Sequence, residues 1–532
     1  MKMVLRWIAI GCIALLGLAP AMAQDDKPQS GGVLNWFDYA DPARLDLHTE
    51  SPLGVSQAIV GIYSGLVQWG PEAENAQKVS PDLAEKWEAS EDGTSYTFTL
   101  RQGVKWHDGE PFSSADALYS LKRIIDPEVR SPRCGSLLRP LVKDVEAPDD
   151  STIVVHLQFP TTIVLPALAS AWCKILPKHI LERDGDLTRP ESQIGTGPFK
   201  LKKYVRGSVV EWERNPDYFI KGLPYLDGVK QYIIKARPTQ MAALKAGKTD
   251  FWYGWPPLNS KQIGEIRKAR KDLIYKKSSP GGISQLHMNS TKPPFDNPDM
   301  RRAVNLAIDR HEIMKKAYDG DLIPCVILPK EAFGDYALPA EEALNAPGCR
   351  EPKDQDLAEA KKLVAKHYPD GIDIEVAVRS VGNYVDIASL VIQQLKQIGI
   401  RGKLKTWESA AGFAAWARGD FTMIGVQATA MTFMDPSAPF TLMWTTESPR
   451  NYGRMKLTKL DELYNAGLRE LDEEKRKAIY HEYQREIING DTPTVTYGWP
   501  VGPWFMASKL KGWAPGPTIY DNASYHGMWI AK

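Results

Sequence analysis

The sequence contains little cysteine and has no excess of charge of either sign. Among 532 residues there are 5 cysteines, 66 Lys and Arg, and 65 Asp and Glu. A protein whose main partner is nucleic acid needs a basic surface, so the charge balance argues against that class. No Cys-x-x-Cys pair and no Cys–His cluster has the spacing of metal ligands. We therefore predict neither a bound metal nor any other cofactor.

The motifs of common enzymes are also missing. There is no Gly-x-Ser-x-Gly, and His311-Glu312 and His481-Glu482 lack the second histidine of a zinc-protease helix. Gly247-Lys248-Thr249 ends like a phosphate-binding loop, but Ala242 occupies the position of the first glycine. We therefore expect a protein that is not an enzyme.

After the N-terminus, no apolar run reaches the length of about 20 residues that a membrane-spanning helix needs. The first segment has Lys2 and Arg6, then an apolar stretch from Ile8 to Leu18, then the small residues Ala21–Ala23. This order is typical of a cleaved secretory signal, and a short membrane anchor is the alternative. We predict a signal peptide over residues 1–23 and a soluble mature protein in the periplasm.

Four cysteines follow that segment. An even number in an oxidising compartment suggests two disulfides, and four cysteines allow three pairings. We prefer the pairing of sequence neighbours, Cys134 with Cys173 and Cys325 with Cys349.

Residues 83–120 carry the clearest local pattern. Tyr96, Phe98 and Leu100 alternate with Thr97, Thr99 and Arg101, which predicts a strand with one buried face. Ser113 and Asp116 then form the pattern of a capping box at the start of an apolar helical stretch.

Strand and helix patterns alternate along the rest of the chain, which predicts a mixed α/β fold. The order strand, helix, strand over residues 372–407 is that of a βαβ unit. We expect strands at Val33–Phe37, Ile372–Val378 and Ile400–Trp407, helices at Val55–Val67 and at Tyr384–Ile398 ended by Gly399, and a further helix capped by Asp356.

Several segments, in the same order, resemble the family 5 solute-binding proteins, the extracytoplasmic receptors of peptide, nickel and oligosaccharide ABC importers. The resemblance extends over essentially the whole mature chain. The segments are LAEKWEASEDGTSYTFTLRQGVKWHDGEPFSSADALYS at 83–120, NPDYFIKGLPYLD at 215–227, LKAGKTD at 244–250, and Asn289 followed by PPFD at 293–296 and the helical stretch 301–310.

The resemblance implies an α/β fold of the type II periplasmic-binding architecture, with two lobes and an additional inserted subdomain. We expect lobe I to comprise residues 24–67, 190–277 and 500–532, the inserted subdomain 68–189, and lobe II 278–499. A monomer of this kind would close around a small solute, peptide-like or oligosaccharide-like, and dock on the permease subunits of an ABC importer.

Aromatic residues in Gly- and Pro-containing stretches are candidates for ligand binding, because rings stack on ligands in clefts. By analogy with peptide-binding members, the position after the LKAGKTD turn that reaches the ligand is Tyr253, and Trp255 follows two residues on. Trp499 and Trp407 are further candidates. For any single ring the alternative is packing in the core.

Peptide-binding relatives place an Asp several residues before an acidic residue–Pro pair, where it holds the α-ammonium of the peptide. In this chain the pair is Asp435-Pro436, and Met431 or Thr432 falls at the expected Asp position. An unpaired buried ammonium would be unfavourable. The usual amine contact is therefore in doubt.

The neighbouring residues predict a neutral pocket. Gln427, Thr429 and Met431 would suit a ligand rich in hydroxyl groups, or a peptide held through its backbone. Arg379 is a candidate for binding a ligand carboxylate or phosphate, and a solvent-facing strand end is its alternative. The missing Asp favours sugars, opines or other non-peptide solutes, whereas the frequency of functions in the family favours peptides.

Overall fold

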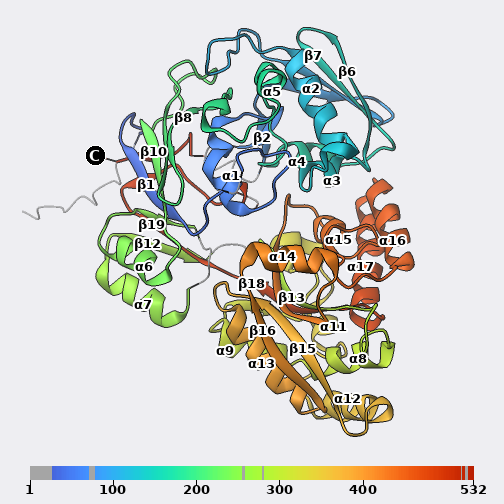
Figure 1. The fold of residues 1–532 in the computed structure, drawn as a ribbon. Coiled ribbons are helices and arrows are strands. Elements are labelled where there is room, and N and C mark those ends of the chain that lie inside the picture. Colours follow the sequence, from blue (N-terminus) through green and yellow to red (C-terminus); the bar gives the residue numbers. More distant parts are fainter. Residues whose placement is uncertain are drawn as a thin grey trace, which may run out of the picture.

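The computed structural model describes residues 27–42, 44–70, 78–253, 258–277, 281–516, 518–521 and 525–531. The predicted signal peptide lies outside the described residues. Two bodies lie one above the other, each built around a β-sheet with helices beside it (Figure 1). The prediction of a mixed α/β fold is confirmed.

The upper body contains a seven-stranded sheet with the order β12-β19-β11-β1-β10-β9-β8. Strand β1 (Val33–Asp38) lies near its centre, parallel to β10 (Gly228–Ile233) and to β11 (Phe251–Trp252). The other strands are β8 (Phe199–Val205), β9 (Val209–Arg214), β12 (Leu273–Lys277) and β19 (Pro503–Ala507).

A four-stranded sheet with the order β4-β5-β7-β6 lies beside it in the upper body. Phe98 and Leu100 are buried on one face of β5 (Ser95–Leu100), as predicted. The predicted capping box is present, with Ser113 and Asp116 closing the first turn of α2 (Ser114–Ile125). The remaining strands are β4 (Ala84–Ala89), β6 (Val142–Asp149) and β7 (Thr152–Leu157).

The lower body contains a six-stranded sheet with the order β14-β18-β13-β17-β15-β16. Strands β15 (Ile372–Arg379) and β16 (Ile400–Trp407) are parallel and joined by α13 (Tyr384–Lys396), so the predicted βαβ unit is confirmed. Gly399 has φ 92°, a left-handed conformation that glycine adopts without strain. The other strands are β13 (Gly282–Met288), β14 (Leu322–Pro324), β17 (Met423–Ala430) and β18 (Thr494–Pro500).

The predicted helix over residues 55–67 is too long. Helix α1 (Leu53–Ile59) passes into one 3-10 turn at Val60–Ile62, and the chain is extended from Tyr63 onwards. The amide of Gly65 donates to Asp82 Oδ2 at 2.7 Å. The chain after residue 62 therefore pairs with the segment around Asp82 instead of continuing the helix.

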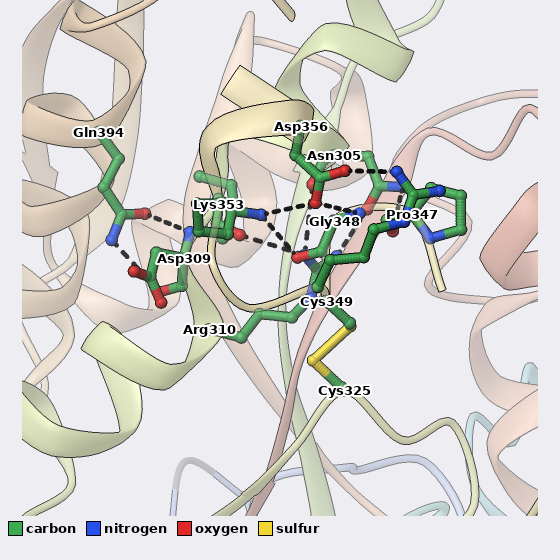
Figure 2. Close-up of polar contacts among 12 residues, drawn as sticks. Asn305, Asp309, Arg310, Cys325, Pro347, Gly348, Cys349, Lys353, Asp356 and Gln394 are labelled. Carbon is green, nitrogen blue, oxygen red and sulfur yellow. Dashed lines mark hydrogen bonds and ion pairs between the residues drawn. A yellow bond between two sulfur atoms is a disulfide. The ribbon is translucent and has the colours of Figure 1, made fainter. Parts of the chain in front are cut away.

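Asp356 lies inside α12 (Asp354–His367) rather than at its N-cap, so that prediction is wrong. Its buried carboxylate accepts hydrogen bonds from the Gly348 amide at 3.0 Å, Arg350 Nη1 at 2.9 Å and Lys353 Nζ at 3.2 Å (Figure 2). A carboxylate held by three donors ties the preceding loop to the helix.

Both preferred disulfides are present. Cys325 and Cys349 are joined with a Cα–Cα distance of 5.8 Å, next to the loop that Asp356 holds (Figure 2). Cys134 and Cys173 are joined with a Cα–Cα distance of 5.3 Å, and they connect α3 (Cys134–Leu138) to the segment after α4 (Val164–Leu168).

The remaining elements complete the two bodies. No helix in the described ranges is both long and apolar enough to cross a membrane. The elements are α5 (Lys178–Asp184), α6 (Arg237–Lys245), α7 (Ser260–Ala269), α8 (Pro298–Ala307), α9 (Arg310–Ala317), α10 (Lys330–Phe333), α11 (Ala340–Leu344), α14 (Ser409–Arg418), α15 (Ala438–Met443), α16 (Thr458–Arg469), α17 (Glu473–Asn489), β2 (Val67–Trp69), β3 (Val79–Pro81), β20 (Leu510–Lys511) and β21 (Trp529–Ile530).

Candidate functional site

A large cleft is lined by residues of both bodies. Its volume is about 2130 Å³. Tyr39 and Tyr253 line it from the seven-stranded side, and Tyr384 and Phe413 line it from the six-stranded side. The chain passes between the two sheets where β12 is followed by β13 and where β18 is followed by β19.

Arg379, at the end of β15, lies on the cleft wall and is 7% exposed. Its Nη1 donates to Ser409 Oγ at 2.7 Å and its Nη2 to Gln427 Oε1 at 3.2 Å. The guanidinium lies 4.1 Å from the ring centroid of Phe413, within cation–π range. Gly412 makes this position possible, because a Cβ there would lie 2.9 Å from Arg379 Cγ.

A second arginine, Arg450, binds Thr429, which lies two residues after Gln427 on the same face of β17. Its Nη1 donates to Thr429 Oγ1 at 2.9 Å, and its guanidinium lies 5.9 Å from the same Phe413 ring. Residues 427 and 429 point to one face because side chains alternate along a strand. The two acceptors, Gln427 and Thr429, therefore hold two cations beside one ring.

A third arginine, Arg133, reaches the cleft from the upper body and is 3% exposed. Its Nη1 donates to Thr432 Oγ1 at 3.2 Å, and its Nη2 donates to Ser51 O at 3.1 Å and to the Tyr520 hydroxyl. Burial, together with the positive charge of Arg450, lowers the pKa of Arg133 from 12.5 to about 10.

The three arginines have no acidic partner. None of the ion pairs in the described part of the chain includes Arg133, Arg379 or Arg450. Carboxylates do line the cleft, but all of them are half-buried or exposed, unlike Arg133 and Arg379. They are Asp41, Glu50, Asp319, Asp321, Glu331, Asp386 and Glu408.

Tyr253 is 4% exposed and lies on the opposite wall. Its ring packs edge-on against Trp36, with the centroids 5.6 Å apart. Its hydroxyl is buried and has no hydrogen-bond partner among the described residues. Burial also raises the pKa of this hydroxyl well above its ordinary value, so it stays protonated and is available as a donor.

The structure brings four of the predicted ligand-binding residues to the cleft, namely Tyr253, Arg379, Gln427 and Thr429. Trp255 lies outside the described residues. The solvent-facing alternative for Arg379 is excluded by its burial. The neutral acceptors of the predicted pocket, Gln427 and Thr429, accept hydrogen bonds from guanidinium groups.

Three other predicted residues do not line the cleft. Met431 and Trp499 are fully buried, and Trp499 Nε1 donates to Ile327 O at 3.0 Å within the core. Trp407 is half-buried at the end of β16, where the Lys405 ammonium lies 4.7 Å from its ring. The placement of Trp499 supports packing in the core, the alternative stated for any single ring.

Sequence reasoning missed Arg133 and Arg450. Neither lies in a motif, and they are separated by more than three hundred residues. No three His, Cys, Asp or Glu side chains come together as metal ligands in the part of the chain that the structure describes.

Comparison with known proteins defines the class. The model of the bacterial extracellular solute-binding proteins, family 5 Middle, matches residues 78–451. The chain is 26% identical over 540 residues to the probable deoxycholate-binding periplasmic protein YgiS of Escherichia coli, with 96% of each chain covered. The solved structure of the periplasmic binding protein DppA of Helicobacter pylori, in complex with the peptide STSA, has a TM-score of 0.81 and 27% identity, covering 95% of this chain and 99% of that one.

A third relative carries a different ligand. The structure of AgaA from A. tumefaciens R10, in complex with agropinic acid, has a TM-score of 0.81 and 25% identity, covering 94% of this chain and 99% of that one. The fold and the cleft are those of a solute-binding protein of the type II periplasmic class, as predicted. The chain belongs to the family 5 extracellular solute-binding proteins, and its prediction as the substrate-binding component of an ABC importer is confirmed at the level of the family.

Proposed function

We propose that this protein is the periplasmic receptor of an ABC importer and captures a mid-sized, peptide-like solute without changing it. The observation that carries the proposal is the cleft of about 2130 Å³ lined by both bodies. A volume of this size exceeds the roughly 300–1,000 Å³ of an ordinary small-molecule pocket. Tyr253, Arg379, Gln427 and Thr429 are the proposed contacts.

We propose that binding closes two lobes. Lobe I comprises residues 24–67, 190–277 and 500–532, residues 68–189 form the inserted subdomain, and lobe II is 278–499. The monomer closes by a hinge between the two lobes, and the closed form docks on the membrane permease.

The identity of the solute is a separate matter. The names or titles of relatives mention peptides, deoxycholate or agropinic acid. Peptide-like solutes are therefore the first candidate, and opine-like or oligosaccharide-like solutes are the second. Thr432 favours the second candidate, because a threonine has no negative charge that could form an ion pair with a free α-ammonium group.

The test is native mass spectrometry of protein purified from its own cell envelope. We expect one bound small solute per monomer, released unchanged by mild unfolding, and a change in tryptophan fluorescence when it rebinds. Chemical conversion of the bound solute would show an enzyme instead. Binding of unfolded proteins without any small solute would show a chaperone.

A further inference from the structure

The charges of the cleft are arranged in a way that the proposed function leaves unexplained. Along β17 and the residues after it, three neutral acceptors each hold an arginine from a different part of the chain. Gln427 holds Arg379, Thr429 holds Arg450 and Thr432 holds Arg133.

Hydrogen bonds from amide and hydroxyl groups position a guanidinium but leave its charge uncompensated. Burial of an unpaired charge is unfavourable, and buried charges are normally paired. The buried Arg476 pairs with Asp435 at 2.8 Å and the buried Arg301 pairs with Asp491, whereas the buried Arg310 donates only to carbonyl and amide oxygens. Arg133 and Arg379 are equally buried and lack such a carboxylate.

The three acceptors lie within residues 427–432, on β17 and the segment after it. Phe413 has both Arg379 and Arg450 within 5.9 Å of its ring centroid. The positive charge of Arg450 also lowers the pKa of Arg133. Like charges gathered in a partly dry cleft repel one another, so the site is complete only when an anion enters.

Two residues that line the same cleft each have an unsatisfied donor. Arg379 Nε and the Tyr253 hydroxyl are buried without a hydrogen-bond partner among the described residues. A buried donor without an acceptor is unfavourable until an acceptor oxygen arrives. Both groups are more than nine-tenths buried.

We propose that the cleft is specific for a solute that carries an oxyanion, a carboxylate or a phosphate, bound between the guanidiniums of Arg133, Arg379 and Arg450, and that it rejects solutes whose only charge is a free ammonium. Oxygen atoms of the anion accept from the free guanidinium edges, and Arg–oxyanion pairs are among the strongest hydrogen-bonded contacts in proteins. The Arg379 guanidinium also lies within 5.6 Å of the ring centroids of Phe413, Tyr384 and Trp416. This inference rests on the proposed receptor function.

The experiment uses the mature protein, freed of bound solute by unfolding and refolding with its disulfides intact. It is offered an equimolar mixture of paired probes and analysed by native mass spectrometry. Each pair has an anionic member and a neutral member. The first pair is an N-acetyl peptide with a free C-terminal carboxylate and the same peptide with a C-terminal amide. The others are a sugar acid with its neutral sugar and a phosphorylated compound with the corresponding alcohol. We expect the anionic member of at least one pair to be retained ten times more strongly than its neutral partner.

The carboxylate and phosphate pairs decide which oxyanion the site takes. Arg450→Gln should reduce the preference for the anion about tenfold, because the anion loses one charged hydrogen-bond donor. Lys396→Gln is the matched control: it removes one positive charge at the opposite end of α13 from the cleft residue Tyr384, and it should leave the preference unchanged.

Thr432→Asp gives a second, independent measurement. The new carboxylate would pair with Arg133 and compete with the anion, so retention of anionic probes should fall while the protein stays folded. Equal retention of acids and neutral partners, or preferential retention of probes with a free ammonium, would overturn the anion inference and leave the receptor function standing. Retention of no probe, together with no co-purified solute, would contradict the receptor function itself.

Discussion

Arg133 Nη1 donates a hydrogen bond to Thr432 Oγ1 across 3.2 Å, and the two residues are 299 positions apart in the chain. The backbone of Thr432 takes part as well, because its carbonyl accepts from Ser170 Oγ at 3.1 Å. A segment on the upper body and a segment that follows β17 in the lower body are thus held together at the edge of the cleft.

Replacement of Thr432 by valine keeps the shape of the side chain and removes the acceptor. We expect Thr432→Val to lower the free energy of unfolding by about 1–3 kcal/mol, because a buried charged donor loses its partner. Chemical denaturation measures the change. Thr97→Val is the control, since Thr97 is exposed on β5 and such changes are usually within about 0.5 kcal/mol. Equal effects of the two substitutions would contradict the structural role of the Arg133 contact.

Tyr253 and Tyr525 form a matched pair for a test of ligand contact. Both have buried hydroxyls without a partner in the described structure, and both rings pack against Trp36, at 5.6 and 5.9 Å between centroids. Only Tyr253 lines the cleft. Neither phenylalanine variant should lose stability, because no hydrogen bond is removed.

We expect Tyr253→Phe to weaken binding of the co-purified solute about tenfold, which is about 1.4 kcal/mol, and Tyr525→Phe to leave it unchanged. Isothermal titration calorimetry measures both affinities. Loss of affinity in both variants, or in neither, would show that the Tyr253 hydroxyl does not reach the solute.

Gly412 sets the position of Arg379. An added Cβ would lie 2.9 Å from Arg379 Cγ and 3.3 Å from Trp407 Cβ, so Gly412→Ala must displace the stem of the arginine. We expect solute affinity to fall at least about tenfold, in line with one lost charged contact. Titration of the refolded, solute-free protein gives the affinity.

Gly264→Ala is the control for Gly412→Ala. Gly264 lies in α7, and a Cβ there meets nothing within 4 Å. This substitution should stabilise the protein by about 0.5–1 kcal/mol through helix propensity and leave the affinity unchanged. An unchanged affinity in Gly412→Ala would mean that Arg379 is not a ligand contact.

Asp38 gives the folded protein a defined pH dependence. Burial raises the pKa of this carboxyl from 3.8 to about 7, against the opposing hydrogen bonds from the amides of Tyr39 and Ala40. Between these two values the folded state holds a proton that the unfolded state has released. Stability contributed by this group is therefore complete below pH 3.8 and is lost as the pH rises towards 7.

Asp38→Asn removes the titration and keeps an oxygen acceptor. The free energy of unfolding of the variant, relative to the original protein, should rise by on the order of 1 kcal/mol per pH unit between pH 4 and 7 and stay level above that range. Urea denaturation at several pH values measures the difference. Two parallel stability curves would show that Asp38 titrates normally.

The sequence alone predicted much of the local structure. Alternation at Phe98 and Leu100 and the capping box at Ser113 depend only on neighbouring residues, and both were confirmed. The helix after Leu53 was predicted too long, because the pairing of its C-terminal continuation with the segment at Asp82 is a tertiary contact. Asp356 was misassigned as a cap for the same reason, since its three donors belong to a folded loop.

The sequence by itself determined the family, the α/β class, the two disulfides and four of the residues that line the cleft. Ordered motifs and residue periodicity can be recognised without knowledge of the fold. Only the tertiary structure decided which arginines bind the acceptors of β17 and the segment after it. Arg133, Arg379 and Arg450 come from three separate segments, and the alternation of side chains along β17 and the segment after it bring them to one surface. Electrostatic interactions depend on distance in space, and sequence separation carries no information about that distance.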